Sequence, residues 1–178
     1  MAKFKSKNTR LGYMRAKLLI IVGIPPYIER ALSEIANFVE ELEDIAEVKV
    51  IGLWKNNFYA ISQNEEKKFI LEDSSQNIDH ILKTVEIDAI FISFTKRAAQ
   101  NHLLGKRGLL ESLKNQERRH LIKVYLFVAE SILSEIEIYS KQLDLLSIKR
   151  LGVAITTKEL RMMIRKDLAD FLTRKINA

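Results

Sequence analysis

The apolar run Ala89–Phe94 (AIFISF) constrains the fold more than any other feature of this chain. Its apolar residues do not alternate with polar ones, so a strand built from it has to be covered on both faces. Strands of this kind are typical of parallel sheets with helices packed on either side. The run therefore predicts an α/β fold with this strand near the middle of the sheet.

Four other apolar runs, around Leu18, Val48, Val124 and Val153, alternate with segments of helical periodicity. The clearest helical segment follows Pro25-Pro26 and has one apolar face, formed by Ile28, Leu32, Ile35, Val39 and Leu42. Repeated strand–helix units favour parallel strands joined by crossover helices. We therefore predict a three-layer α/β/α sandwich with a mainly parallel five-stranded sheet, in Rossmann-like or flavodoxin-like order.

An antiparallel hairpin is predicted as an insertion after the second strand. Val48–Trp54, Phe58–Ser62 and Lys68–Leu71 are short runs separated by polar turns, which favours a meander. Ser74-Ser75 is then expected to cap the next helix. The last strand is predicted at 150–155.

The charge of the chain is concentrated at its beginning. Of 29 basic residues, six lie in residues 1–17 without any acidic residue, and the other 23 balance the 23 acidic ones. The 178 residues suit a single domain. We therefore divide the chain into a basic arm, 1–16, and one α/β domain, 17–178. An arm of this charge density favours binding to polyanions through counterion release.

Targeting and redox signals are weak. The apolar stretch after the arm is short for a signal peptide and is followed by two prolines, and no apolar run approaches the ~20 residues of a membrane span. The chain has no Cys, which excludes disulfides and thiolate metal sites. We expect a soluble, cytoplasmic protein without a membrane partner.

The segment after the central strand is the best candidate for a binding site. Ligands of α/β sheets bind beyond the carboxyl ends of the strands, where Thr95, Lys96 and Arg97 are expected to lie in a loop. The turn Gly105–Gly108 presents two further cations just before a helix, and His102 lies in the same acid-free stretch. Together these residues could hold a phosphate.

Motifs for enzymatic chemistry are missing. There is no glycine-rich dinucleotide or P-loop signature, and the turn Gly23–Pro26 has too few free N–H groups to hold a pyrophosphate. None of the three histidines, His80, His102 and His120, has a second ligand at metal-binding spacing. We therefore expect neither a cofactor nor a metal.

The resulting hypothesis is a non-enzymatic protein associated with nucleic acid or a nucleoprotein assembly. Its candidate anion-binding residues are Lys3, Lys5, Lys7, Arg10, Arg15, Lys96, Arg97, His102, Lys106 and Arg107. A homodimer or a protein partner docked through apolar residues of the arm is an alternative.

Two other function classes remain as alternatives. From Ile28 to Phe94 the order of elements resembles the restriction-nuclease-like core, which implies a metal-dependent nuclease, possibly degenerate, using Glu72, Asp73 and Lys68. That family's acidic and Glu-x-Lys metal motif is not matched on adjacent strands here. The third class is a sensor domain that binds a small anion or nucleotide at the strand ends.

Overall fold

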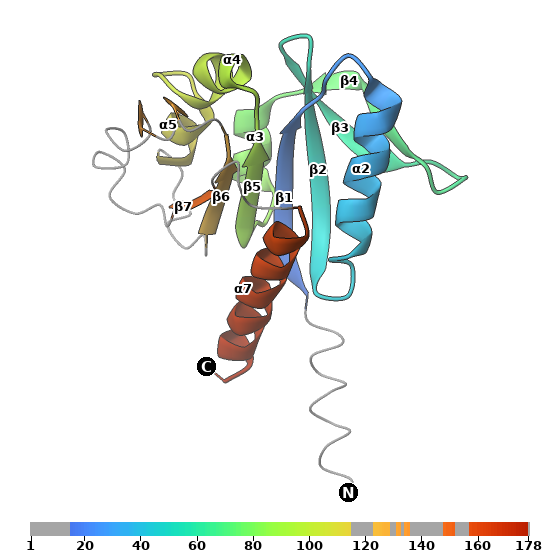
Figure 1. Cartoon of the computed structure of the whole chain (residues 1–178), viewed down its shortest axis with the longest axis vertical. Coiled ribbons are helices and arrows are strands. Elements are labelled where there is room, and N and C mark those ends of the chain that lie inside the picture. Colours follow the sequence, from blue (N-terminus) through green and yellow to red (C-terminus); the bar gives the residue numbers. More distant parts are fainter. Residues whose placement is uncertain are drawn as a thin grey trace, which may run out of the picture.

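The computed structural model describes residues 15–114, 123–128, 131–132, 134–135, 148–151 and 157–177. Its strands form one seven-stranded sheet in the order β4-β3-β2-β1-β5-β6-β7 (Figure 1). The strands are β1 (Ala16–Gly23), β2 (Ala46–Trp54), β3 (Asn57–Gln63), β4 (Phe69–Gln76), β5 (Ala89–Ser93), β6 (Lys123–Phe127) and β7 (Ile148–Leu151).

The helical segments in the described ranges differ greatly in length. They are α2 (Ile28–Glu40), α3 (Ile78–Thr84), α4 (Lys96–Ala98), the π-helical η1 (Ala99–Leu103), α5 (Leu109–Lys114) and α7 (Thr157–Asn177), and residues 131–132 and 134–135 are also helical. None of them is long and apolar enough to cross a membrane.

The sheet is mixed, as the sequence predicts. β2, β1, β5, β6 and β7 pair in parallel, whereas β3 and β4 add antiparallel to β2. The sheet has seven strands rather than five because the inserted hairpin pairs directly with β2 and widens it. Of the five apolar runs, the first four lie in this one sheet, and Val153 lies outside the described residues.

Helices pack on both faces of the sheet, as a three-layer arrangement requires. Leu18 and Ile20 of β1 belong to a buried cluster that includes residues of α2 and α7. Leu19 and Ile21 belong to a second cluster with residues of α3, η1 and α5. All four side chains are at most 1% exposed. The unbroken apolar run of β1 thus fills two cores at once.

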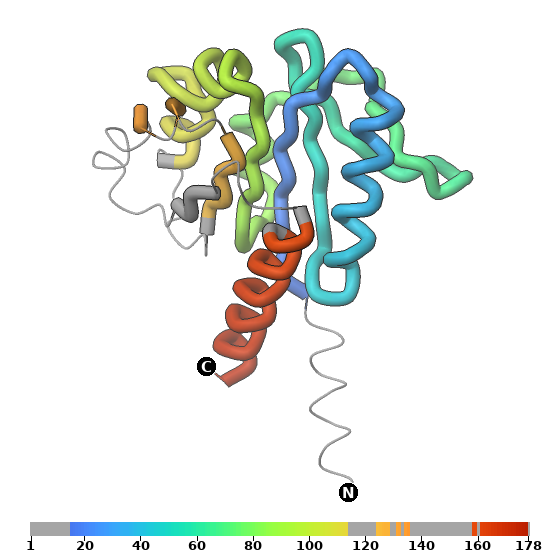
Figure 2. The backbone as a smooth tube through the Cα atoms, in the orientation of Figure 1, coloured from blue at the N-terminus to red at the C-terminus, as the bar shows by residue number. Residues whose placement is uncertain are grey.

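Both ends of the described domain lie at the same edge of the sheet. β1 begins and α7 ends near the amino ends of the parallel strands (Figure 2). We call this the amino edge, and the opposite edge, where β1, β5 and β6 end, the carboxyl edge. The two edges are separated by the length of β1, eight residues or roughly 25 Å.

Two predicted boundaries are wrong, the helix cap at Ser74-Ser75 and the end of the preceding strand at Leu71. Ser74-Ser75 do not cap a helix, because the chain resumes its pairing with β3 beyond a bulge and β4 runs on to Gln76. Asn77 caps α3 instead, with its side-chain oxygen accepting a bond from the His80 N–H at 3.2 Å. The last described strand, Ile148–Leu151, overlaps the predicted strand at Arg150 and Leu151, and the rest of the predicted range, 152–155, lies outside the described residues.

The contact between β6 and α7 gives a test of the fold. The buried Tyr125 hydroxyl donates to Asp167 Oδ2 at 2.7 Å, and burial is the main cause that raises the pKa of this tyrosine. Tyr125→Phe removes the bond and is expected to lower the free energy of unfolding by about 1 kcal/mol in urea titrations. Tyr27→Phe is the control, since Tyr27 is 80% exposed and its replacement is expected to change nothing. Equal stability of the two variants would show that the hydroxyl does not hold α7 on the sheet.

Candidate functional site

The carboxyl edge contains the point where the chain connections diverge. From β1 the chain crosses to β2 on one side, and from β5 it continues to β6 on the other, although β1 and β5 are neighbours. Ligands of open α/β sheets bind in the crevice at such a point. The residues that follow β1 and β5 are therefore the first place to look for a site.

The residues after β5 form a helix, not the predicted loop. The Thr95 side chain accepts a bond from the Ala98 N–H at 3.3 Å and its carbonyl accepts one from the Ala99 N–H at 2.9 Å. This N-cap starts α4, which continues directly into η1. Lys96 and Arg97 thus occupy the first turn of a helical segment of roughly 12 Å.

The second pair of cations lies in a tight turn at the other end of this segment. The Gly108 N–H donates to the Gly105 carbonyl at 3.1 Å, and Gly105 has a φ of +90°. A Cβ on Gly108 would lie only 2.4 Å from the Leu103 carbonyl oxygen. Both glycines are therefore needed by the turn itself, which leaves Lys106 and Arg107 exposed at its tip.

These four cations are not used by the fold. Lys96, Arg97, Lys106 and Arg107 are exposed and form no ion pair or side-chain hydrogen bond with another described residue. Positive charge in the first turn of a helix opposes the helix dipole, so Lys96 and Arg97 do not stabilise the helix that carries them. The arrangement is instead suited to attract an anion.

His102 differs from the four cations. Its ring packs edge-on against Phe58, with the ring centroids 5.9 Å apart. Burial lowers the pKa of this histidine below its usual value of 6.5. The imidazole is therefore neutral near pH 7 and adds no positive charge to the edge.

A cavity of about 650 Å³ opens at the carboxyl edge, on the face that carries α2 and α7. Its floor includes Val22, Ser93 and Phe127, and its walls include Ile35 and Phe38 of α2 together with Thr95 and Lys96. We call it the carboxyl-edge cavity. Sequence patterns do not predict it, because it depends on where helices from distant parts of the chain lie.

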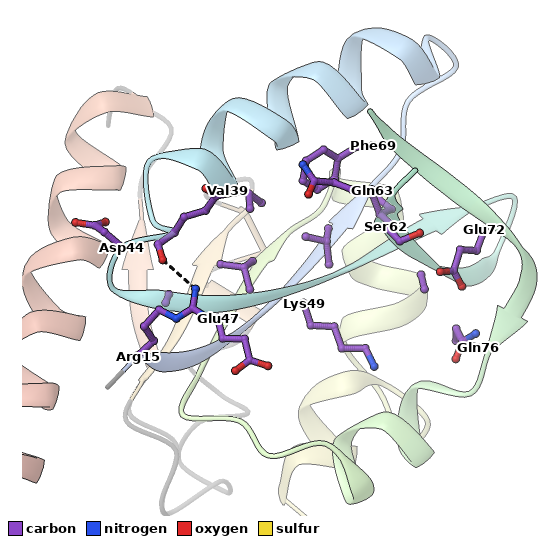
Figure 3. A pocket seen from close by; sticks show the side chains of 16 residues that line it. Arg15, Val39, Asp44, Glu47, Lys49, Ser62, Gln63, Phe69, Glu72 and Gln76 are labelled. Carbon is purple, nitrogen blue, oxygen red and sulfur yellow. Dashed lines mark hydrogen bonds between the residues drawn. The ribbon is translucent and has the colours of Figure 1, made fainter. Parts of the chain in front are cut away.

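The amino edge carries a second hollow, of about 900 Å³, where β2 and β3 separate (Figure 3). Their pairing ends at Val50 and Ile61, so the start of β2 pairs only with β1 among the described strands. Figure 3 shows Lys49 and Gln76 on one side of β2, with Val39 and Phe69 on the other. The charged residues that line the hollow are Arg15, Glu43, Asp44, Glu47, Lys49 and Glu72, an acidic excess.

The residues of the nuclease alternative do not form a metal site in this structure. Glu72 and Asp73 are both exposed and lie in the bulged part of β4, between the paired residues Leu71 and Ser75. Lys68 pairs with Glu66 at 3.3 Å. Across the described ranges, no group of three or more His, Asp or Glu side chains lies close enough to share a metal ion.

The basic arm meets the domain at the amino edge. Arg15 Nη1 donates to the Glu43 carbonyl at 3.2 Å, and Lys17 pairs with Glu86 at 2.8 Å. Lys3, Lys5, Lys7 and Arg10 lie outside the described residues. Arg15 is thus separated from Lys96 and Arg97 by the length of β1, and the predicted site residues do not all come together.

Helix α7 is fixed to this same edge by ion pairs. Arg165 Nη1 donates to Asp44 Oδ1 at 2.7 Å and to the Glu41 carbonyl at 3.1 Å, while Arg161 pairs with the Glu41 carboxylate. The Arg165 guanidinium holds the pKa of Asp44 below its ordinary value of 3.8. Arg161 and Arg165 of α7 are therefore engaged in contacts within the domain.

Comparison with known proteins adds no identification: the chain matches no protein-family model and no curated protein.

The Arg165–Asp44 pair predicts a pH-dependent contribution to stability. Because the folded-state pKa of Asp44 is lowered, the contribution is complete above the ordinary pKa of 3.8 and is lost as the pH falls through the folded-state value. Asp44→Asn is expected to cost about 0.5 kcal/mol near pH 6, since both partners are substantially exposed, and almost nothing near pH 2. Urea unfolding at the two pH values measures this, with Asp73→Asn as an exposed control. A deficit that persists unchanged at the lower pH would contradict the assignment.

Proposed function

We propose that this protein is a non-enzymatic component that associates with nucleic acid or a nucleoprotein assembly. The observation that carries the proposal is the charge distribution. Residues 1–17 hold six cations and no acid, whereas the rest of the chain is formally neutral. Clustered cations bind polyanions by releasing counterions, independently of the fold beside them.

The placement of charge on the domain supports the carboxyl edge as the second contact. Lys96, Arg97, Lys106 and Arg107 are exposed there without ionic partners among the described residues. The hollow at the amino edge has an acidic excess, which disfavours a polyanion. Because the two pairs of cations lie at opposite ends of a helical segment, they suit a polyanion with several phosphates better than one isolated phosphate.

The order of the parallel strands supports the same edge. Counted along the chain, the five parallel strands stand in the order second, first, third, fourth, fifth, which is the order of flavodoxin-like sheets. In that arrangement the functional end is the carboxyl edge. The arm, with up to ~50 Å of contour for its fourteen residues before Arg15, is long enough to reach it or to bind separately.

Deletion of residues 1–14 tests the contribution of the arm. It removes Lys3, Lys5, Lys7 and Arg10 and leaves β1 intact. The slope of log K against log salt for a DNA duplex is expected to become shallower by about 2 to 4 units, while thermal unfolding is unchanged. Failure of the full-length chain to bind DNA or RNA at ~50 mM salt would reject the proposal and favour a protein-docking arm.

Substitutions at the carboxyl edge test the second contact. Lys96→Ala/Arg97→Ala and Lys106→Ala/Arg107→Ala are each expected to flatten the salt slope by about 1 to 2 units and to change stability by less than about 0.5 kcal/mol. Lys158→Ala/Lys166→Ala removes equal charge from exposed positions of α7 and serves as the matched control. If this control weakens binding as much as the edge variants do, binding follows net charge and not this surface.

A further inference from the structure

The carboxyl-edge cavity is explained by one row of residues across the sheet. Val22, Ser93 and Phe127 are register partners on β1, β5 and β6. The next row inward on the same face, Ile20, Phe91 and Tyr125, is at most 5% exposed, but all three residues of the outer row are only half-buried. Among the described residues, none of α7 lies over this outer row.

Helix α7 covers the inner row of the sheet. Tyr125 bonds to Asp167, and Ile164, Leu168 and Leu172 complete the buried face of the helix. On the other side, α2 covers the row only at its flank, through Ile35 and Phe38. The cavity lies beside α2, no described residue of α7 lines it, and its volume of about 650 Å³ lies within the range typical of small-molecule sites.

The lining of the cavity combines aromatic rings, hydroxyl groups and charged side chains. Several phenylalanine rings line the cavity: Phe38 of α2 lies 5.3 Å from Phe91 of β5 between ring centroids, and Phe127 forms part of the floor. Ser93 places one hydroxyl in the apolar floor, and no described residue bonds to it. Two charged residues line the cavity: Lys96, which has no ionic partner in the described part of the chain, and Glu34 of α2, whose carboxylate pairs with Arg30 at 3.2 Å.

We propose that the carboxyl-edge cavity binds a small molecule that has a flat aromatic body and one anionic group. The body lies on the Val22–Ser93–Phe127 row against the phenylalanine rings, the Ser93 hydroxyl orients a polar atom of it, and Lys96 pairs with the anionic group. Phosphate, sulfonate and carboxylate share the chemistry that Lys96 recognises. This proposal does not depend on binding to nucleic acid.

Two fluorescent probes test the assignment on the full-length chain. Anilinonaphthalene sulfonate has an aromatic body and an anion, and phenylnaphthylamine is its uncharged analogue. We expect both to bind with one site per chain. Lys96→Ala is expected to weaken the sulfonate about three- to fivefold and to leave the uncharged probe unchanged, with Lys106→Ala as the control. An equal effect on both probes, or no effect on either, would overturn the role of Lys96.

A cavity-filling variant tests the location. Ser93→Leu is expected to weaken both probes by about tenfold or more and to keep the cooperative unfolding transition, because the new side chain enters empty space. Ser62→Leu makes the same change on β3 at the other hollow and should leave both affinities unchanged. If Ser93→Leu fails to fold, Val22→Phe fills the same floor.

The alternative occupants give different results. If neither probe binds the folded chain, the cavity is filled by another part of this chain or a second copy, and the proposal is wrong. If both probes bind but Ser93→Leu and Val22→Phe leave them unaffected, they bind elsewhere, and the proposal is again wrong. Adenosine monophosphate is expected to compete with the sulfonate probe for the wild-type chain but not with DNA bound to the arm. This result would distinguish a ligand of the cavity from general polyanion binding.

Discussion

The rest of the structure depends on β1, which pairs with a strand on each side and is covered by helices on both faces of the sheet. β1 lies between β2 and β5, and its side chains enter the two buried clusters alternately. A strand with these demands has to be central and parallel to its neighbours. Because the chain leaves β1 and β5 in opposite directions, the same strand also defines the point at the carboxyl edge where a ligand can approach.

Much of the fold follows from local patterns, and the errors have local physical causes. The unbroken runs of β1 and β5 predict buried parallel strands, because no solvated face is left in the sequence. The residues Ser74-Ser75 mislead, because serine satisfies a helix cap or an exposed edge strand equally well, and only the pairing of β4 with β3 decides between them. The segment after Thr95 has no apolar periodicity long enough to show its single helical segment.

The candidate site was predictable only where charge marks it. Lys96, Arg97, Lys106 and Arg107 follow a strand in the sequence, and parallel topology alone places them at the carboxyl edge. To predict that Arg15 lies far from them, one needs to know the direction of β1. To predict that His102 packs on Phe58, one needs contacts between residues far apart in the chain. Predicting the cavity required still more, since it lies where, among the described helices, α2 and α7 leave the row Val22, Ser93 and Phe127 only half-buried. The one sequence signal for it is Ser93, a hydroxyl within an otherwise apolar strand.

The central claim is that the carboxyl edge is the binding edge of this domain. Amide chemical-shift mapping of the full-length, isotope-labelled chain with a short DNA duplex at ~50 mM salt tests it most directly. The account predicts that, within the described domain, the largest shifts occur at Thr95–Arg97 and at the Gly105–Gly108 turn. Shifts concentrated instead at Glu47, Lys49 and Glu72 of the amino edge, with none after β5, would contradict it.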